Sequence, residues 1–394
     1  MPFSSAEHTG ARIREQRRLA RLTQRQLADR IPYSYSLLNQ VECGARTPSD
    51  AFISAVAEAL SVSPTVLTEP ASTTGAQRER LAALMRPIRE ALDLYDLDPL
   101  PHPGRRPLPV LAGEADALCQ RVRATQLRSA ALDLPALIGD LTHAAHSEPS
   151  TAAWRALASA YRSAHDVALK VGYRDLSTVA LDRMGWAAER ASDPCLAAIR
   201  HYKRALGHER SELDLGRRLI QLGHDVLDGE ESRESLAVAG QLHLGASAVA
   251  ARCNDEAAVE RHIRAAHELA TRVGGDASDV HWLGFGHTNV ALHEMGAALT
   301  MRRFDQALGQ ARALKTLPAS TLTSRRARFL VDWAFVEMET GYPEAALRRL
   351  ADARRVAPEQ TRYLPRTREA VTGLLHIGRR TPDALTHMGA WIGL

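Results

Sequence analysis

The chain has 394 residues, of which 45% are apolar, 24% charged and 5% aromatic. This length predicts two or three domains, and apolar and charged fractions near the globular average exclude wholesale disorder. No apolar run approaches the roughly 20 residues that span a bilayer, and the first residues show no signal-peptide pattern, so we expect a cytoplasmic protein without membrane contact.

The cysteines are widely spaced and include no Cys-x-x-Cys pair: Cys43, Cys119, Cys195 and Cys253. This spacing excludes a disulfide framework and a zinc site built from consecutive ligands, and it fits a reducing compartment. Arginine carries almost all of the positive charge, because 47 arginines accompany only three lysines, Lys170, Lys203 and Lys315. The net charge of +4 is mild and indicates no function by itself.

Residues 8–70 are predicted to form a domain of five short helices. Between positions 10 and 48, eight arginines outnumber three acidic residues. Thr47 is expected to cap the fourth helix, with Pro48 in its first turn. The apolar positions that recur at helical spacing form the predicted core: Ile13, Ala20, Leu27, Ala28, Ile31, Leu38, Val41, Ile53, Val56, Ala57, Leu60 and Leu67.

Residues 22–44 contain the strongest local signals. Thr23 and Gln26 form a capping box, which predicts a helix of about eight residues that begins at position 24. Pro32 stops this helix, and Ser34 caps a second helix over residues 35–42. Gly44 is placed to end the second helix in a left-handed conformation. Two short helices joined by such a turn predict a helix-turn-helix.

These residues resemble the phage-repressor type (Cro-like, or XRE) of helix-turn-helix. The matching positions are Leu22-Thr23-Gln24, Leu27-Ala28, Ser34, Glu42, Gly44, Pro48, Ala57 and Ala59-Leu60. The chain departs from the family at Pro32, where glycine is usual, and at Cys43, where a residue that touches phosphate is common. The resemblance implies a transcription regulator that binds a palindromic operator in double-stranded DNA as a homodimer.

The second helix of such a motif enters the major groove with its amino-terminal half toward the base edges. Four of its side chains point away from the predicted core and are candidates to read bases: Tyr35, Ser36, Asn39 and Gln40. Gln24, Arg25 and Arg46 are expected to hold phosphates. The capping residues Thr23 and Ser34 complete the predicted DNA-binding set. A structural bundle with a solvated polar face is the alternative interpretation.

Residues 71–111 are predicted to connect two domains. A helix is expected over residues 76–97, and it precedes a stretch with five prolines between positions 98 and 109. Because proline lacks the amide hydrogen and clashes with the preceding turn, this stretch is not expected inside a helix.

Residues 112–394 show helical spacing almost throughout, so the predicted fold class is all-α: a five-helix helix-turn-helix domain followed by an array of helical repeats. Three segments resemble the Gly-x-Tyr-x-x-Ala-Leu turn of tetratricopeptide (TPR) repeats. Their alanines Ala258, Ala307 and Ala346 lie 49 and 39 positions apart, which indicates divergent repeats rather than the regular 34-residue unit. An unrelated helical bundle is the alternative.

This combination of modules resembles helix-turn-helix regulators of antibiotic-producing actinobacteria and peptide-pheromone receptors of Gram-positive bacteria. The resemblance implies dimerisation through residues 112–394 and control by a peptide or small-molecule effector. A helix predicted over residues 280–301 has Gly286, Asn289, His293 and Gly296 along one line. Such polar groups beside an aromatic side chain suit a ligand. The predicted effector residues are Gln241, His243, Trp282, Gly286, Asn289 and His293. Glycines that only allow close helix packing are the alternative.

No motif indicates an enzyme, a cofactor or a metal site. A glycine-rich phosphate loop and a nucleophile elbow are missing, and Ala297 stands where a His-Glu-x-x-His zinc motif needs its second histidine after His293. His143 and His146 share a helix face without further ligands nearby in the sequence. The second functional hypothesis is a protein-interaction scaffold or antitoxin-like partner with secondary DNA binding.

Overall fold

The computed structural model describes residues 9–20, 22–60, 62, 64–68, 75–97, 106–208, 213–227, 229, 231–277, 279–314, 316–377 and 382–394. Over these residues the regular structure is helical, apart from one isolated antiparallel bridge between Ala277 and Phe285. The predicted all-α fold class is confirmed. The chain divides into two compact units, Met1–Arg78 with Gly389–Leu394, and Glu79–Met388. Among the helices described, none combines the length and apolar character that crossing a bilayer requires.

The first unit contains the predicted helix-turn-helix. Its helices are α1 (Thr9–Leu19), α2 (Gln24–Ala28), α3 (Tyr35–Glu42), α4 (Asp50–Ala59) and α5 (Pro64–Thr68). The capping box at Thr23 forms, Ser34 caps α3, and Gly44 adopts a left-handed φ of 79°. The side chains buried between these helices form one core: Ile13, Leu27, Ala28, Ile31, Leu38, Val41, Phe52, Ile53, Val56, Ala57 and Leu67.

Two local expectations in this unit are wrong. Helix α2 has five residues rather than about eight, because it ends at Ala28, and Asp29 is its C-cap with right-handed helical dihedrals, ahead of Pro32. Helix α4 begins at Asp50, and its cap is Ser49, whose hydroxyl accepts a hydrogen bond from the Phe52 amide at 3.3 Å. Thr47 therefore lies outside the helix that it was expected to cap.

The predicted connector contributes to the second unit. Helix α6 (Gly75–Asp93) places Met85, Ile88 and Leu92 in the main core of that unit. Residues 98–105 of the proline-rich stretch lie outside the described residues. Helix α7 begins at Leu108, so Pro109 lies inside a helix, contrary to expectation. Its missing amide hydrogen is tolerated there because the amides of the first helical turn have no partner within the helix.

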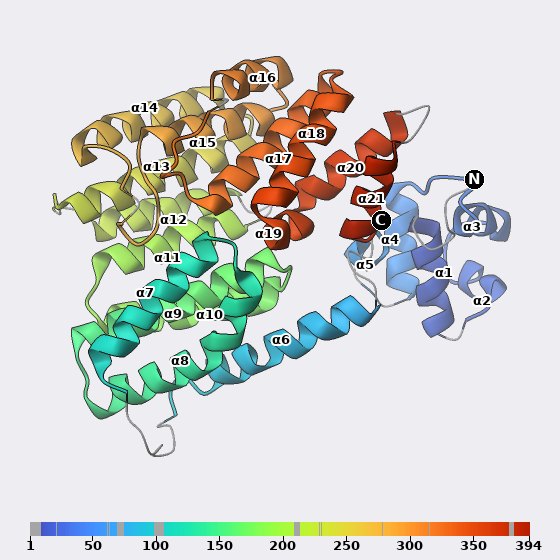
Figure 1. The fold of residues 1–394 in the computed structure, drawn as a ribbon. Coiled ribbons are helices and arrows are strands. Elements are labelled where there is room, and N and C mark those ends of the chain that lie inside the picture. Colours follow the sequence, from blue (N-terminus) through green and yellow to red (C-terminus); the bar gives the residue numbers. More distant parts are fainter. Residues whose placement is uncertain are drawn as a thin grey trace. The chain divides into compact units, whose positions relative to one another are not determined.

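The second unit is a TPR-like succession of antiparallel helical hairpins (Figure 1). Helices that follow each other in the chain pack in pairs, and α9, α11, α13, α15 and α17 pack in sequence. The helices are α7 (Leu108–Arg123), α8 (Leu127–Ser147), α9 (Thr151–Lys170), α10 (Arg174–Arg190), α11 (Pro194–Gly207), α12 (Leu213–Val226), α13 (Arg233–Arg252), α14 (Glu256–Val273), α15 (His287–Thr300), α16 (Phe304–Ala313), α17 (Thr323–Glu339), α18 (Pro343–Val356), α19 (Pro358–Tyr363) and α20 (Pro365–Ile377). The last helix, α21 (Asp383–Ile392), belongs to this unit up to Met388 and to the first unit from Gly389.

Six of the described hairpin turns share a left-handed residue. Their φ values lie between 49° and 93°, and a helix begins shortly after each of them: Thr125, Gly172, Ser192, Asn254, Arg302 and Gly341. The left-handed conformation costs residues with a β-carbon roughly 1–2 kcal/mol, so glycine is the expected occupant. Because only two of the six are glycine, a search for turn glycines finds only part of the repeat pattern.

The helix predicted over residues 280–301 begins later than expected. Helix α15 starts at His287, and the preceding segment turns through positive φ values at His281, Trp282 and Gly284. Gly286 is the residue that caps α15, and a β-carbon there would overlap Asp276. Gly286 therefore lies before the helix and does not continue the line of residues predicted along it.

Candidate functional site

The side chains predicted to read bases lie on the outer face of α3. Tyr35 is 50% exposed, and Ser36, Asn39 and Gln40 are exposed as well. Leu38 faces the core on the opposite side and is fully buried. An outward polar face over an anchored apolar face is what a helix needs in order to enter the major groove.

A hydrogen-bond network joins the outer face of α3 to the start of α2. The Tyr35 hydroxyl donates to Gln24 Oε1 at 3.2 Å. Gln24 Nε2 donates to Asn39 Oδ1 at 3.3 Å and to Glu42 Oε2 at 2.8 Å. Gln24, which the sequence assigned to a phosphate, therefore holds two of the predicted base-reading side chains in position.

Arg17 and Glu42 form a buried ion pair beneath this network. Arg17 Nε and Nη2 donate to the two carboxylate oxygens at 2.7 and 2.8 Å, and the side chains are only 9% and 1% exposed. Arg17 Nη1 also donates to the Leu22 carbonyl at 2.8 Å. The hydrogen bond to Glu42 raises the pKa of Arg17. The pair fixes α1 against α3 and the chain that leads into α2.

Arg12 also has a structural role. Its Nε donates to the Leu67 carbonyl at 2.8 Å and its Nη2 to the Thr68 carbonyl at 3.1 Å, so it caps the end of α5. Burial lowers the pKa of Arg12. Two of the eight arginines in this basic region thus stabilise the domain instead of facing a partner.

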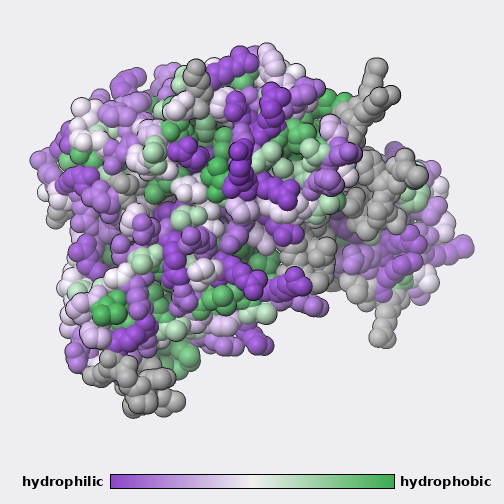
Figure 2. Space-filling view, in the orientation of Figure 1, coloured by the Kyte–Doolittle hydropathy of each residue, from purple (hydrophilic) through white to green (hydrophobic). Residues whose placement is uncertain are grey.

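Arg14 and Arg18 are candidate phosphate contacts that the sequence reasoning missed. Both are exposed on α1, and they line a surface concavity of about 470 Å³ together with Thr23, Gln24 and Asn39. Arg25 and Arg46, which the sequence did assign to phosphates, are exposed too. Figure 2 shows mostly hydrophilic side chains on the visible face of α1 and α2. The four-residue spacing of Arg14 and Arg18 was the available signal, since it places both on one helix face.

The predicted effector residues separate into different environments. Gln241, Trp282 and His293 line a cavity of about 720 Å³ among the helices of the second unit. Asn289 is buried and donates to Gln241 Oε1 at 3.1 Å. His243 is not part of the lining, because its ring lies between those of His224 and His262, tilted against both, with ring centroids 4.6 and 5.4 Å away.

The cavity wall is strongly cationic, which the sequence did not predict. Arg123, Lys170 and Lys203 come from α7, α9 and α11. The later helices contribute Arg252, Arg325, Arg328 and Arg366. The lining also includes one carboxylate, that of Asp332. Two of the three lysines in the chain therefore face this one cavity.

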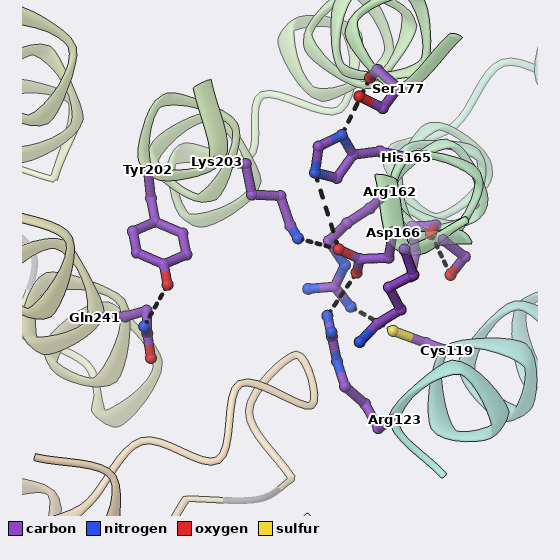
Figure 3. Close-up of polar contacts among 12 residues, drawn as sticks. Cys119, Arg123, Arg162, His165, Asp166, Ser177, Tyr202, Lys203 and Gln241 are labelled. Atoms are coloured by element: carbon purple, nitrogen blue, oxygen red, sulfur yellow. Dashed lines mark hydrogen bonds and ion pairs between the residues drawn. The ribbon is translucent and has the colours of Figure 1, made fainter. Parts of the chain in front are cut away.

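Asp166 is the counter-ion for the first group of cations (Figure 3). Its carboxylate accepts from Arg123 Nη2 at 2.7 Å and from Lys203 Nζ at 2.5 Å, and its side chain is 7% exposed. The nearby cations hold the pKa of Asp166 well below its usual range, despite its burial. His165 lies alongside, with Nδ1 donating to the Ser177 carbonyl at 3.1 Å. The single negative charge of Asp166 is thus shared between two buried cations.

We expect this unit to lose stability as the pH falls from about 6.5 toward 4. Burial lowers the pKa of His165 and His243 to about 4 and that of His293 to about 3. Below about pH 6.5 the unfolded chain takes up protons that the folded chain still excludes, so stability present above that pH is lost. For the buried His165 the loss is on the order of 3 kcal/mol.

Urea denaturation of the full chain, followed by circular dichroism between about pH 7 and 4, measures this loss. Substituting His165→Gln keeps a donor for the Ser177 carbonyl and should flatten the pH dependence. The matched control is His376→Gln at an exposed position, which should leave the pH dependence of stability unchanged. If the free energy of unfolding depends on pH equally in the wild type and both variants, the assignment of this loss to His165 is contradicted.

Comparison with known proteins adds one match in the first unit. A family model described as a helix-turn-helix domain matches residues 8–69. No curated protein matches the chain. The chain is similar to a solved structure, the crystal structure of Bacillus thuringiensis PlcR in complex with the peptide PapR7 and DNA. The sequence identity is 13% and the TM-score is 0.27, and the alignment covers 89% of this chain and 95% of that chain. Residues 8–69 therefore belong to the helix-turn-helix domains, and an array of TPR-like helical hairpins follows them in the chain.

Proposed function

We propose that the protein is a cytoplasmic, sequence-specific transcription regulator that binds a palindromic operator as a homodimer. In this proposal α3 of each copy lies in one of two successive major grooves, about one helical turn apart. The observation that carries it is the exposed polar face of α3, which Gln24 and the buried pair Arg17–Glu42 hold from behind. This preorganisation favours base reading over a merely solvated surface.

Each polar group has a distinct role in this proposal. Asn39 and Gln40 carry amides that pair bidentately with adenine in the major groove. The exposed arginines Arg14, Arg18 and Arg46 neutralise phosphates, which supplies affinity without sequence information. With four or five phosphate contacts per subunit, the log–log dependence of affinity on salt should have a slope on the order of −8 for a dimer.

The cavity in the second unit is the proposed effector site. Its volume of about 720 Å³ lies within the range of small-molecule sites, and Gln241, Trp282 and His293 are among its lining residues. We propose that effector binding there alters the affinity of the dimer for its operator. The change in affinity equals the difference in effector binding between the DNA-bound and free protein.

Replacing Asn39 and Gln40 together by alanine is expected to relax sequence preference. Each lost bidentate pair removes about 1–3 kcal/mol of discrimination against a wrong base. Fluorescence anisotropy with an operator selected from genomic fragments and with a scrambled duplex, at two salt concentrations, measures this directly. The double variant should bind both duplexes almost equally, while its salt slope stays that of the wild type.

The matched control for this experiment is Arg18→Ala. Loss of one phosphate contact per subunit should weaken binding to both duplexes equally and reduce the steepness of the salt dependence. If wild-type protein binds every fragment with the same weak affinity, the regulator proposal fails, and the interaction scaffold with secondary DNA binding is favoured instead.

A further inference from the structure

The cavity in the second unit has an excess of positive charge. Seven cationic side chains line it, and the described carboxylates that pair with them are three: Asp332 in the lining, Asp166 behind it and Glu369, which lies 3.9 Å from Arg366. Lys203 is 9% exposed, so water screens its charge poorly. Burying cations without matching anions is costly, which indicates that the site is incomplete without a negatively charged occupant.

Two of these cations have only neutral partners. Lys170 Nζ donates to Gln360 Oε1, and Arg325 donates to Asn289 Oδ1 and to the Leu283 carbonyl. In the part of the chain that the structure describes, neither has a carboxylate oxygen within 4 Å. Burial and the neighbouring Arg123 lower the pKa of Lys170 to about 7.

Arg162 adds to the uncompensated charge behind the wall. It is 1% exposed, and its Nη2 donates to the Cys119 thiol at 2.8 Å (Figure 3). Its Nε and Nη1 have no hydrogen-bond partner among the described residues. Burial is the main cause that lowers the pKa of Lys203 to about 8, and the positive charges of Arg123 and Arg162 add to it.

A series of hydrogen-bonded side chains orients the Tyr202 hydroxyl so that it acts as a donor at the cavity. Because arginine can only donate, Arg325 fixes the oxygen of Asn289 toward itself, and the Asn289 amide then donates to Gln241 Oε1. Gln241 Nε2 in turn donates to the Tyr202 hydroxyl oxygen at 2.8 Å (Figure 3). The Tyr202 hydrogen is thereby left for another acceptor at the cavity wall.

We propose that this cavity binds a small polyanion, a compound of metabolite size with two or more carboxylate or phosphate groups. Arg123, Lys170 and Lys203 would hold one anionic group, and Arg325 with the Tyr202 hydroxyl would hold another. The cavity of about 720 Å³ accommodates a drug-sized ligand and is larger than one inorganic ion requires. The inference deepens the effector part of the proposed function and rests on the same site.

Isothermal titration of the full-length protein without DNA tests this proposal. The probes are pyrophosphate and citrate, with chloride at equal ionic strength as the blank. At least one probe should bind the wild type, and Lys170→Gln should weaken that binding about tenfold or more, since it removes a charge-assisted hydrogen bond. A preference between the probes identifies phosphate or carboxylate as the recognised group. Because no DNA is present, failure here is distinct from failure of operator binding.

Lys170→Gln is not expected to impair folding, because it removes a buried charge that has no carboxylate partner. The matched control is Arg233→Gln, an exposed arginine that pairs with Asp279 and is not part of the cavity wall. It should bind the probes as the wild type does. Equal weakening in both variants, unchanged binding in Lys170→Gln, or no binding of either probe above the chloride blank overturns the proposal.

Lysine titration gives a second, direct measurement in the wild type. Only three lysines need assignment when their amines carry isotope-labelled methyl groups for NMR. The groups that act on Lys170 are Arg123, Asp166, Lys203, Arg328 and the Gln360 amide. A bound polyanion should raise the pKa of Lys170 by about 1–3, since an opposite charge stabilises the protonated amine. A pKa that does not move in the presence of saturating probe contradicts binding at this wall.

Discussion

Replacing Glu42 by alanine is expected to unfold most of the helix-turn-helix domain and to abolish operator binding. The substitution leaves the Arg17 guanidinium buried beside Leu22 without its carboxylate. Breaking a buried ion pair by removing one partner costs about 3–5 kcal/mol, a large share of the stability of a domain of some 60 residues. Gln24 also loses an acceptor, so Tyr35 and Asn39 lose part of their support.

Hydrogen exchange of the full chain, read by mass spectrometry over residues 9–68, measures this effect. The matched control is Glu15→Ala, an exposed acid on α1, which should keep wild-type protection. Replacing both partners, as Arg17→Met with Glu42→Leu, should restore protection because no buried charge remains. Its operator affinity should recover only in part, since Gln24 still lacks the carboxylate. Wild-type protection in Glu42→Ala would contradict the structural role of the pair.

The fold of the first unit could be predicted from sequence because its signals are local. The capping box at Thr23, the break at Pro32 and the left-handed Gly44 each depend on a few consecutive residues. The roles of the arginines on α1 could not be predicted in this way. Arg12 and Arg17 look like Arg14 and Arg18 in a helical pattern, yet the Leu67 and Thr68 carbonyls and the Glu42 carboxylate that they bind lie 25 to 56 positions away.

The cavity depends even more on tertiary structure. Lys170, Lys203 and Arg325 lie on three different helices, and only the stacking of hairpins brings them to one wall. The sequence shows that lysine is rare in this chain, but it does not show where those lysines meet. Similarly, Trp282 and His293 were predicted on adjacent faces of one helix, whereas a loop with positive φ values places Trp282 at the cavity before α15 begins.

Replacing Asp166 by asparagine is expected to be the most damaging single change in the second unit. Asparagine keeps the size of the side chain, but Arg123 and Lys203 lose the carboxylate that neutralises them. At about pH 6 the cost should be on the order of 3–5 kcal/mol, as for other broken buried ion pairs. The matched control, Asp279→Asn, removes an exposed partner of Arg233 and should cost less than about 1 kcal/mol.

The pH dependence of this deficit distinguishes lost charge from lost hydrogen bonds. Asp166 raises the pKa of Lys203 against the effect of burial, which nevertheless lowers it to about 8. Without the carboxylate that pKa falls further, and the amine sheds its proton at a pH where the wild-type amine keeps it. Since unfolded lysine titrates near 10.4, the variant gains stability relative to the wild type between the folded pKa of Lys203 in the variant and that in the wild type.

Urea denaturation between about pH 6 and 8 should therefore show that the stability deficit of Asp166→Asn shrinks as the pH rises. Added pyrophosphate should stabilise the variant more than the wild type, because it supplies the missing negative charge. A deficit that is constant over this interval would mean that hydrogen bonding, not charge balance, makes Asp166 necessary.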